Sequence, residues 1–154
     1  SASTMEGSLV AEVKIMKAGW LLQKKYDGCF GMAIIRGNGF NQMLSRTGED
    51  YTTSCLHILE EIEEAATEQS ESWDEFVVLG EVWHPMLAFP TISGQFRKRA
   101  VSELRFVAND ILPVGLTTDR PYYKRLNDLK ALLPTIVGAR VYVSTVDQPT
   151  GGQV

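Results

Sequence analysis

Hydrophobic residues recur at two spacings along the chain, and each spacing predicts a different kind of element. Residues 8–17 have apolar positions three and four apart, so they are predicted to form a helix. A second helix is expected after Thr53 or Ser54, either of which could cap it, because the apolar residues that follow share one face. A third is expected from Pro121 through Leu133, with the proline in the first turn, where it is tolerated.

Alternating or continuous apolar runs predict six strands around these helices. They cover residues 19–25, 30–35, a run ending at 44–46, 76–83, 104–113 and 141–146. Tyr26-Asp27-Gly28 is predicted to be a tight turn that joins the first two strands in a hairpin, because glycine accepts a positive φ. Residues 36–39 predict a second turn, and residues 85–94 are expected to form a loop. Hairpins followed by inserted helices predict an α+β fold with a mainly antiparallel sheet.

The composition suits one globular domain spanning residues 1–154. Hydrophobic residues make up 44% of the chain and charged residues 22%, which excludes a wholly disordered chain. No apolar run approaches the length of a membrane span, and the first residues lack the pattern of a secretory signal. The two cysteines cannot form a disulfide framework, so a cytoplasmic, reducing location is expected.

Charge is distributed unevenly along the chain. Residues 47–96 contain eleven acidic side chains and no lysine or arginine, whereas residues 1–46 and 97–154 carry more basic than acidic groups. An anionic partner is therefore expected to meet the first and last thirds of the chain. Within the last third, the basic run that begins with Arg97, Lys98 and Arg99 is the best candidate for contact with a DNA backbone.

The string Lys25-Tyr26-Asp27-Gly28 is the strongest candidate for chemistry. Strand alternation places Gln23 and Lys25 on one face and Lys24 on the other. A lysine in a partly closed pocket can lose its proton through desolvation and a neighbouring cation, and then attacks carbonyl groups or activated phosphorus. Taken alone, the same four residues are also typical of a charged hairpin at the surface.

Further strings follow the lysine in an order that is characteristic of one family. Residues 18–28 look like its nucleophile motif, Leu44-Ser-Arg-Thr-Gly48 looks like its second motif, and Val78-Leu-Gly-Glu-Val82 is similar to its third. Ser93-Gly94 with the basic residues 97–99 resembles a segment of the phage enzymes. Over residues 8–146 the chain thus resembles the covalent nucleotidyltransferase superfamily, and most closely the bacteriophage-type ATP-dependent DNA ligases.

This resemblance implies a function that uses ATP and Mg2+. In the family, the lysine attacks the α-phosphate of ATP, releases pyrophosphate and holds AMP, which then passes to the 5′-phosphate of nicked DNA. By matched position, the implied nucleotide-binding residues are Gln23, Lys25, Asp27, Gly28, Ser45, Arg46 and Glu81. Lys25 would be the nucleophile, Arg46 would contact a phosphate, and Glu81 would serve the ribose or the metal. The resemblance also implies DNA replication or repair in a prokaryotic or phage-infected cell.

The chain departs from the family pattern in two ways. Phe30 stands where the family usually has arginine, Leu79 where it has aspartate, and Asn109 where an aromatic residue stacks on adenine. The family's fourth and fifth motifs and its OB-fold, expected beyond Val146, are absent from the sequence. The chain is therefore expected to be a truncated adenylation domain that does not ligate DNA alone. Self-association or a partner chain is expected to cover the open side.

Two alternatives remain at this stage. One is a non-catalytic, ligase-like protein that binds a nucleotide, nucleic acid or another protein, which Phe30, Leu79, Asn109 and the short chain favour. The other is a different nucleotidyltransferase, either an RNA ligase or an mRNA-capping guanylyltransferase. The strings at residues 45–48 and 93–94 favour the DNA enzymes over these two.

Overall fold

The computed structural model describes residues 22–23, 26–37, 39–69, 75–113, 119–136, 138–144 and 146–147. The chain divides into a larger unit, residues 26–143, and a smaller unit formed by residues 1–25 and 144–154. In the smaller unit, β1 (Leu22–Gln23) pairs antiparallel with β7 (Val146–Asp147). The helix predicted at residues 8–17 and the candidate nucleophile Lys25 lie outside the described residues.

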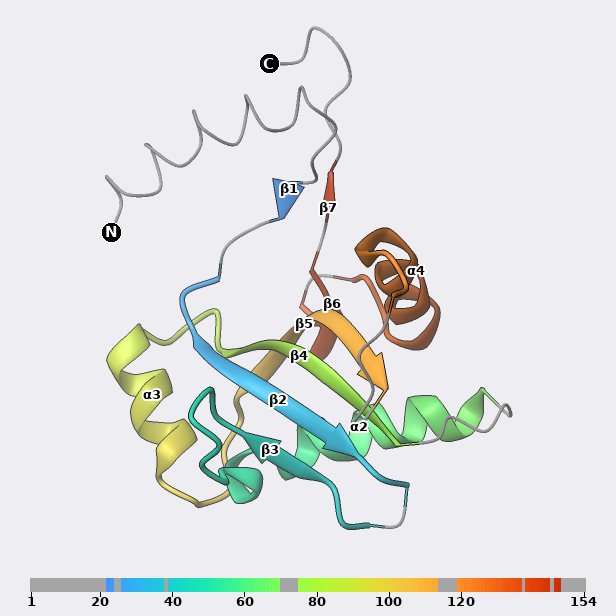
Figure 1. Ribbon diagram of the computed structural model, residues 1–154. Helices are drawn as coiled ribbons and strands as arrows, with labels where there is room; N and C mark the ends of the chain where they lie inside the picture. The colour runs from blue at the N-terminus through green and yellow to red at the C-terminus, as the bar shows by residue number, and fades with distance from the viewer. Residues whose placement is uncertain are drawn as a thin grey trace, which may run out of the picture. The chain divides into compact units, whose positions relative to one another are not determined.

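The larger unit is built on a five-stranded sheet with the order β3-β2-β4-β5-β6 (Figure 1). Its strands are β2 (Cys29–Ile35), β3 (Gln42–Leu44), β4 (Phe76–Trp83), β5 (Arg105–Pro113) and β6 (Val141–Val143). Neighbouring strands are antiparallel except β5 and β6, which are parallel. The predicted α+β class and the mainly antiparallel sheet are confirmed.

Helices pack against this sheet and complete its core. They are the 3-10 helix η1 (Thr52–Cys55) and the α-helices α2 (Leu56–Glu68), α3 (Phe89–Arg97) and α4 (Tyr122–Leu132). α2 and α3 contact β2, and α4 contacts β5. None of the helices in the described ranges is long and apolar enough to cross a membrane.

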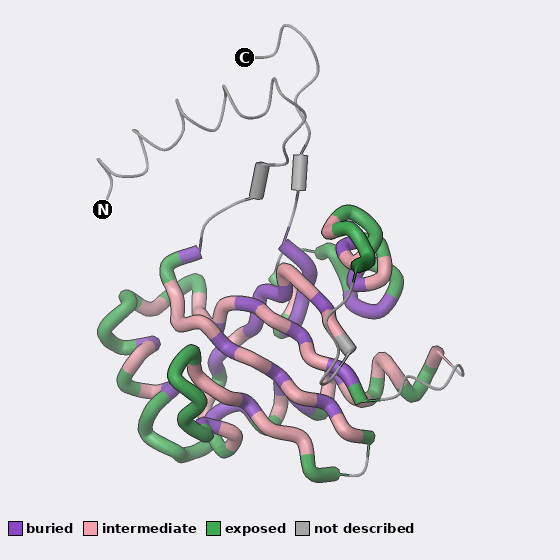
Figure 2. Tube along the Cα trace, viewed as in Figure 1, coloured by how far each residue is buried: buried purple, intermediate pink, exposed green. Residues whose placement is uncertain are grey.

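The central strand β4 shows how the sequence pattern separates the two faces of the sheet. Phe76, Val78, Gly80 and Val82 are buried, whereas the residues between them are partly exposed. Figure 2 shows the same alternation of buried and intermediate positions along the strands. Because successive side chains of a strand point to opposite faces, Glu81 lies on the face that is less covered.

The predicted hairpin between residues 19–25 and 30–35 is wrong. The described part of the first segment pairs with β7, whereas β2 pairs with β3 and β4. Gly28 does not have a positive φ. A Cβ atom at this position would instead collide with the carbonyl oxygen of Val82 and lie 2.8 Å from the Cβ of Trp83. Glycine is required there because β2 begins against the backbone at the end of β4, which is a close approach and not a turn.

The second predicted turn is confirmed. Gly37 and Gly39 have φ values of 73° and 83°, which glycine adopts without strain, and they lie between β2 and β3. The last predicted strand, residues 141–146, is divided, because β6 ends at Val143 and the chain then enters the smaller unit as β7.

The start of α2 differs from the prediction. Neither Thr53 nor Ser54 caps the helix, because both lie within η1 and the N-cap position is Cys55. The buried hydroxyl of Ser54 donates instead to the carbonyl oxygen of Phe96, at 2.8 Å. This bond ties the end of α3 to η1.

The loop predicted at residues 85–94 is correct for residues 85–88 and wrong for the rest, because α3 begins at Phe89. Pro90 lies in the first turn of the helix, where its missing N–H costs nothing. Ile92 and Phe96, one turn apart, are 0% and 2% exposed and anchor the helix on the core. The sequence predicts a loop here because proline and glycine occur within a helix that has only two buried residues.

Candidate functional site

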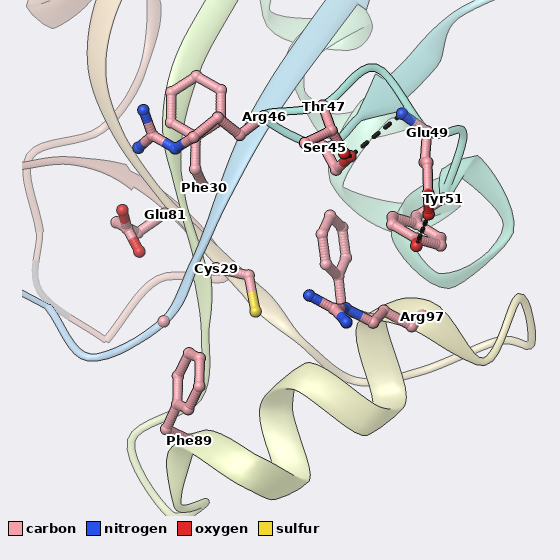
Figure 3. A pocket seen from close by; sticks show the side chains of 12 residues that line it. Cys29, Phe30, Ser45, Arg46, Thr47, Glu49, Tyr51, Glu81, Phe89 and Arg97 are labelled. Atoms are coloured by element: carbon pink, nitrogen blue, oxygen red, sulfur yellow. Dashed lines mark hydrogen bonds between the residues drawn. The ribbon is translucent and has the colours of Figure 1, made fainter.

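A pocket of about 550 Å³ opens where the start of β2, the loop after β3, the end of β4 and helix α3 meet (Figure 3). This volume is in the range of small-molecule sites, which hold roughly 300–1,000 Å³. The pocket is lined by backbone and by polar, charged and aromatic side chains from all four elements. It lies within the larger unit, in residues 26–143.

Strand register places the first two side chains of the pocket. Phe30 on β2 lies opposite Glu81 on β4, so both project from the less covered face of the sheet. Gly28 brings the start of β2 close to β4, as its contact with Val82 shows. The pocket therefore has a carboxylate and an aromatic ring on one wall.

The loop after β3 presents Arg46 to this wall. Its guanidinium lies 4.4 Å from the centre of the Phe30 ring, which is a cation–π contact. The loop closes on itself, since the N–H of Ser45 donates to the carbonyl of Glu49 and the N–H of Gly48 donates to the carbonyl of Ser45. Gly48 has a φ of 86°, which allows the turn without strain. The fixed loop and the Phe30 ring hold Arg46 at the pocket.

The opposite side of the loop is held by a tyrosine. The hydroxyl of Tyr51 donates to the carboxylate of Glu49, and this bond raises the pKa of the tyrosine. The Tyr51 ring packs against Phe96 of α3, with 4.9 Å between ring centres. Glu49 is thus already engaged by the protein, and Tyr51 links the loop to α3.

Helix α3 supplies a second cation to the pocket. Arg97, in its last turn, lines the pocket together with Cys29. Burial raises the pKa of the Cys29 thiol, and the charge of Arg97 lowers it while that of Glu81 raises it. Cys29 is half-buried, whereas Cys55, the other cysteine, is fully buried.

Some of the predicted site residues line the pocket, and others do not. Gly28, Ser45, Arg46 and Glu81 line one pocket. Asp27 is exposed and does not line it. Gln23 belongs to β1 of the smaller unit, where its side chain is not described, and Lys25 lies outside the described residues.

The three basic residues predicted to contact DNA separate in space. Arg97 lines the pocket, whereas Lys98 lines a different hollow of about 460 Å³. Arg99 donates a hydrogen bond to the carbonyl oxygen of Asp50 at 3.3 Å, and its guanidinium lies 5.2 Å from the centre of the Tyr51 ring. Arg99 has a φ of 57°, so the chain turns sharply after the helix and separates these side chains.

Sequence reasoning missed the contribution of Phe30 to the site. In the family pattern Phe30 stands for a lost arginine, whereas in the structure its ring supports the guanidinium of Arg46. The signal available was the position of Phe30 two residues after Gly28 on the same strand face as Glu81. No aromatic residue of β5 takes the place of the missing adenine platform at Asn109, because Phe106 is 0% exposed.

The carboxylates of the pocket determine whether it can hold a divalent cation. No group of three His, Cys, Asp or Glu side chains that could hold a metal occurs in the part of the chain that the structure describes. Mg2+ in nucleotide sites is usually held by one or two carboxylates together with phosphates and water. Glu49 and Glu81 both line the pocket, and Glu49 accepts the hydrogen bond of Tyr51. Glu81, with two arginines in the same pocket, fits a Mg2+ ion that arrives with a polyphosphate.

Comparison with known proteins gives a consistent family assignment. The profile of the ATP dependent DNA ligase domain matches residues 2–150. Three solved structures share the fold over 82% of this chain: Pmar-Lig_Pre. (19% identity, TM-score 0.67), Pmar-Lig_PreS3 (20%, 0.64) and the ATP-dependent DNA ligase from bacteriophage T7 in complex with ATP (17%, 0.60). The match covers 30% of each Pmar-Lig chain and 48% of the T7 chain, so this chain spans less than half of their lengths. No curated protein sequence matches it.

Proposed function

The chain belongs to the ATP-dependent DNA ligase domain family, and from that membership we propose that its pocket binds ATP for the transfer of AMP to Lys25. The observation that carries this proposal is the meeting of Arg46 and Glu81 in one pocket of nucleotide size. A guanidinium matches the oxygens of a phosphate, and a carboxylate matches a ribose hydroxyl or a hard cation. Lys25 comes three residues before Gly28, which lines the same pocket.

The proposed reaction is a displacement at phosphorus. The neutral amine of Lys25 attacks the α-phosphorus of ATP and forms a nitrogen–phosphorus bond. The bond between the α-phosphorus and the bridging oxygen breaks, and pyrophosphate leaves with the electron pair. The lysine nitrogen loses a proton to solvent, and AMP remains on the chain as a phosphoramide.

The pocket residues assist this reaction by binding and orienting the nucleotide. Arg46, supported by the Phe30 ring, would hold a phosphate through charge-assisted hydrogen bonds. Glu81 would hold the ribose or the Mg2+ ion, which supplies neutralisation of phosphate charge when bound. Ser45 keeps the loop closed, because its hydroxyl accepts a hydrogen bond from the N–H of Glu49 at 3.1 Å.

The later steps belong to the proposal for the complete enzyme. There, AMP would pass from Lys25 to the 5′-phosphate of nicked DNA, in replication or repair in a prokaryotic or phage-infected cell. Lys98 and Arg99 are exposed and lie outside the pocket, so they are the proposed contacts for the DNA backbone. We propose ligation only for an enzyme that also has the later motifs and the OB-fold.

A non-catalytic nucleotide-binding protein is the second candidate. Phe30 favours it, because a ring takes the position at which the family usually has a phosphate-binding arginine. The two candidates share the nucleotide pocket and differ only in the covalent step.

ATP binding by the Arg46→Ala variant tests the pocket assignment. We expect the variant to bind ATP about 10-fold or more weakly, because a hydrogen bond to a charged group contributes about 1.5–3 kcal/mol. The matched control is Arg36→Ala, since Arg36 donates to the carbonyl of Phe40 and to Gln42, outside the pocket. Isothermal titration calorimetry on the 154-residue chain measures both. Equal ATP affinities of the wild type and Arg46→Ala would show that ATP does not bind in this pocket.

A further inference from the structure

The hydrogen-bonding partners of the arginines divide them into two groups. All eight arginines of the sequence are described. Six donate a hydrogen bond or form an ion pair with an oxygen of the protein: Arg36, Arg99, Arg105, Arg120, Arg125 and Arg140. Among the described residues, Arg46 and Arg97 do neither, and both line the same pocket.

The two arginines reach the pocket from different walls. Arg46 comes from the loop after β3 and lies over Phe30, whereas Arg97 comes from the end of α3 and points toward Cys29 (Figure 3). A guanidinium carries five N–H donors and stays charged at any physiological pH. Two such groups, neither of them hydrogen-bonded to or ion-paired with a described residue, therefore make the pocket a site for an anion with several oxygens.

The position of Arg97 is set by the core and does not depend on its own contacts. The preceding residue, Phe96, is 2% exposed and packs on Tyr51. Its carbonyl accepts the hydrogen bond from the buried hydroxyl of Ser54. The last turn of α3 is thus anchored by ring packing and by a buried hydrogen bond, which fixes the backbone from which Arg97 projects.

We propose that Arg97 is a second phosphate-binding residue of the pocket, which acts with Arg46 on one phosphate-containing ligand. The ligand contains either the polyphosphate of a nucleotide or the terminal 5′-phosphate of a DNA strand, which offer the same charged oxygens. Arg97 would supply from α3 the guanidinium that Phe30 does not supply from β2. The assignment of the ligand as nucleotide or DNA rests on the proposed function, whereas the binding of phosphate by Arg97 does not.

The two cysteines provide a direct measurement. Cys29 lines the pocket beside Arg97, and Cys55 is fully buried, so alkylation of the folded chain reports on Cys29. A phosphate ligand in the pocket slows this alkylation. The concentration of ligand that gives half of the maximal protection measures affinity, even where a variant changes the alkylation rate itself.

The experiment uses the 154-residue chain and three probes: inorganic tripolyphosphate, a nicked duplex with a 5′-phosphate and the same duplex with a 5′-hydroxyl. For the phosphate probe that protects Cys29, we expect half-protection to need about 10-fold more ligand in Arg97→Ala. Arg97→Lys should recover part of this loss because it keeps the charge. Lys124→Ala, which removes an exposed charge on α4 outside the pocket, should stay within about twofold of wild type.

Each outcome bears on a different claim. Equal half-protection in wild type and Arg97→Ala overturns the proposal, as does a lack of protection by every phosphate probe. Dependence on Arg97 with tripolyphosphate assigns it to the nucleotide, and dependence only with the 5′-phosphorylated duplex assigns it to DNA; both support phosphate binding. If tripolyphosphate binding depends on Arg97 but ATP leaves no label on Lys25, the inference stands and the proposed function fails.

Discussion

Replacement of Lys25 by alanine is expected to abolish the retention of AMP by the chain. After incubation with α-labelled ATP and magnesium, the wild type should keep label on a denaturing gel, and Lys25→Ala should fall by about 1,000-fold or more, to background. The reason is chemical, because the methyl group of alanine has no electron pair to form the bond to phosphorus. Noncovalent ATP binding should remain, since Arg46 and Glu81 are unchanged.

The matched control is Lys24→Ala, which removes the same charge one residue earlier. It should label as the wild type does, because the account assigns the reaction to the amine at position 25 alone. Label that survives in Lys25→Ala, or that is lost equally in Lys24→Ala, contradicts the assignment. Label from GTP only would indicate a capping guanylyltransferase. ATP binding without any label would indicate the non-catalytic protein.

Replacement of Gly80 by alanine is expected to cause the largest loss of stability. Gly80 lies in the central strand β4, beside Glu81, and pairs with both β2 and β5. A Cβ atom there would collide with the carbonyl oxygen of Val107 and lie 3.0 Å from the Cα of Ala108. Backbone atoms cannot move without separating the strands. We expect a loss of about 3 kcal/mol in the free energy of unfolding, measured by urea denaturation.

Gly94→Ala is the control for this prediction, since it adds the same methyl group to a glycine. Gly94 lies in α3, and its Cβ would meet no atom within 4 Å other than its two chain neighbours and the backbone of its own helix. Because glycine destabilises a helix interior by about 0.5–1 kcal/mol relative to alanine, this variant should be slightly more stable than the wild type. Equal stability of the Gly80 and Gly94 variants would mean that β4 and β5 are not packed as described.

The central strands could be predicted from sequence because their patterns are local. Phe76 to Trp83 alternates between a buried and a partly exposed face, so both the existence and the bounds of β4 follow from its own residues. The same holds for β2, which is a continuous apolar run, for β5, and for α4, whose buried leucines recur at helical spacing after Pro121.

Strand partners could not be predicted in this way, because pairing is a property of distant segments. Asp27-Gly28 is a local signal, and it predicts a hairpin for the segment before Tyr26. In the structure, Gly28 lets the backbone approach the carbonyl oxygen of Val82, which is more than fifty residues away in the sequence. A glycine required for close approach and one required for a turn look the same in a single sequence.

The candidate site also combines features that the sequence predicts with features that depend on the fold. The order of short strings along the chain was enough to select Gly28, Ser45, Arg46 and Glu81, which meet in one pocket. It did not distinguish Arg97 from Lys98 and Arg99, because the direction of each side chain depends on where α3 ends and how Phe96 is anchored. A run of basic residues shows where positive charge is concentrated along the chain, but not in which direction each side chain points.

The arginine Nε–H resonances of the 15N-labelled chain, followed during a titration with ATP, test the central claim most directly. Arg46→Lys and Arg97→Lys each remove one resonance and so assign it. We expect the Arg46 signal to shift with ATP while the signals of the six arginines with protein partners stay in place; the Arg97 signal should shift as well if Arg97 binds the polyphosphate. An unmoved Arg46 signal, or shifts confined to the other six, would contradict ATP binding in this pocket.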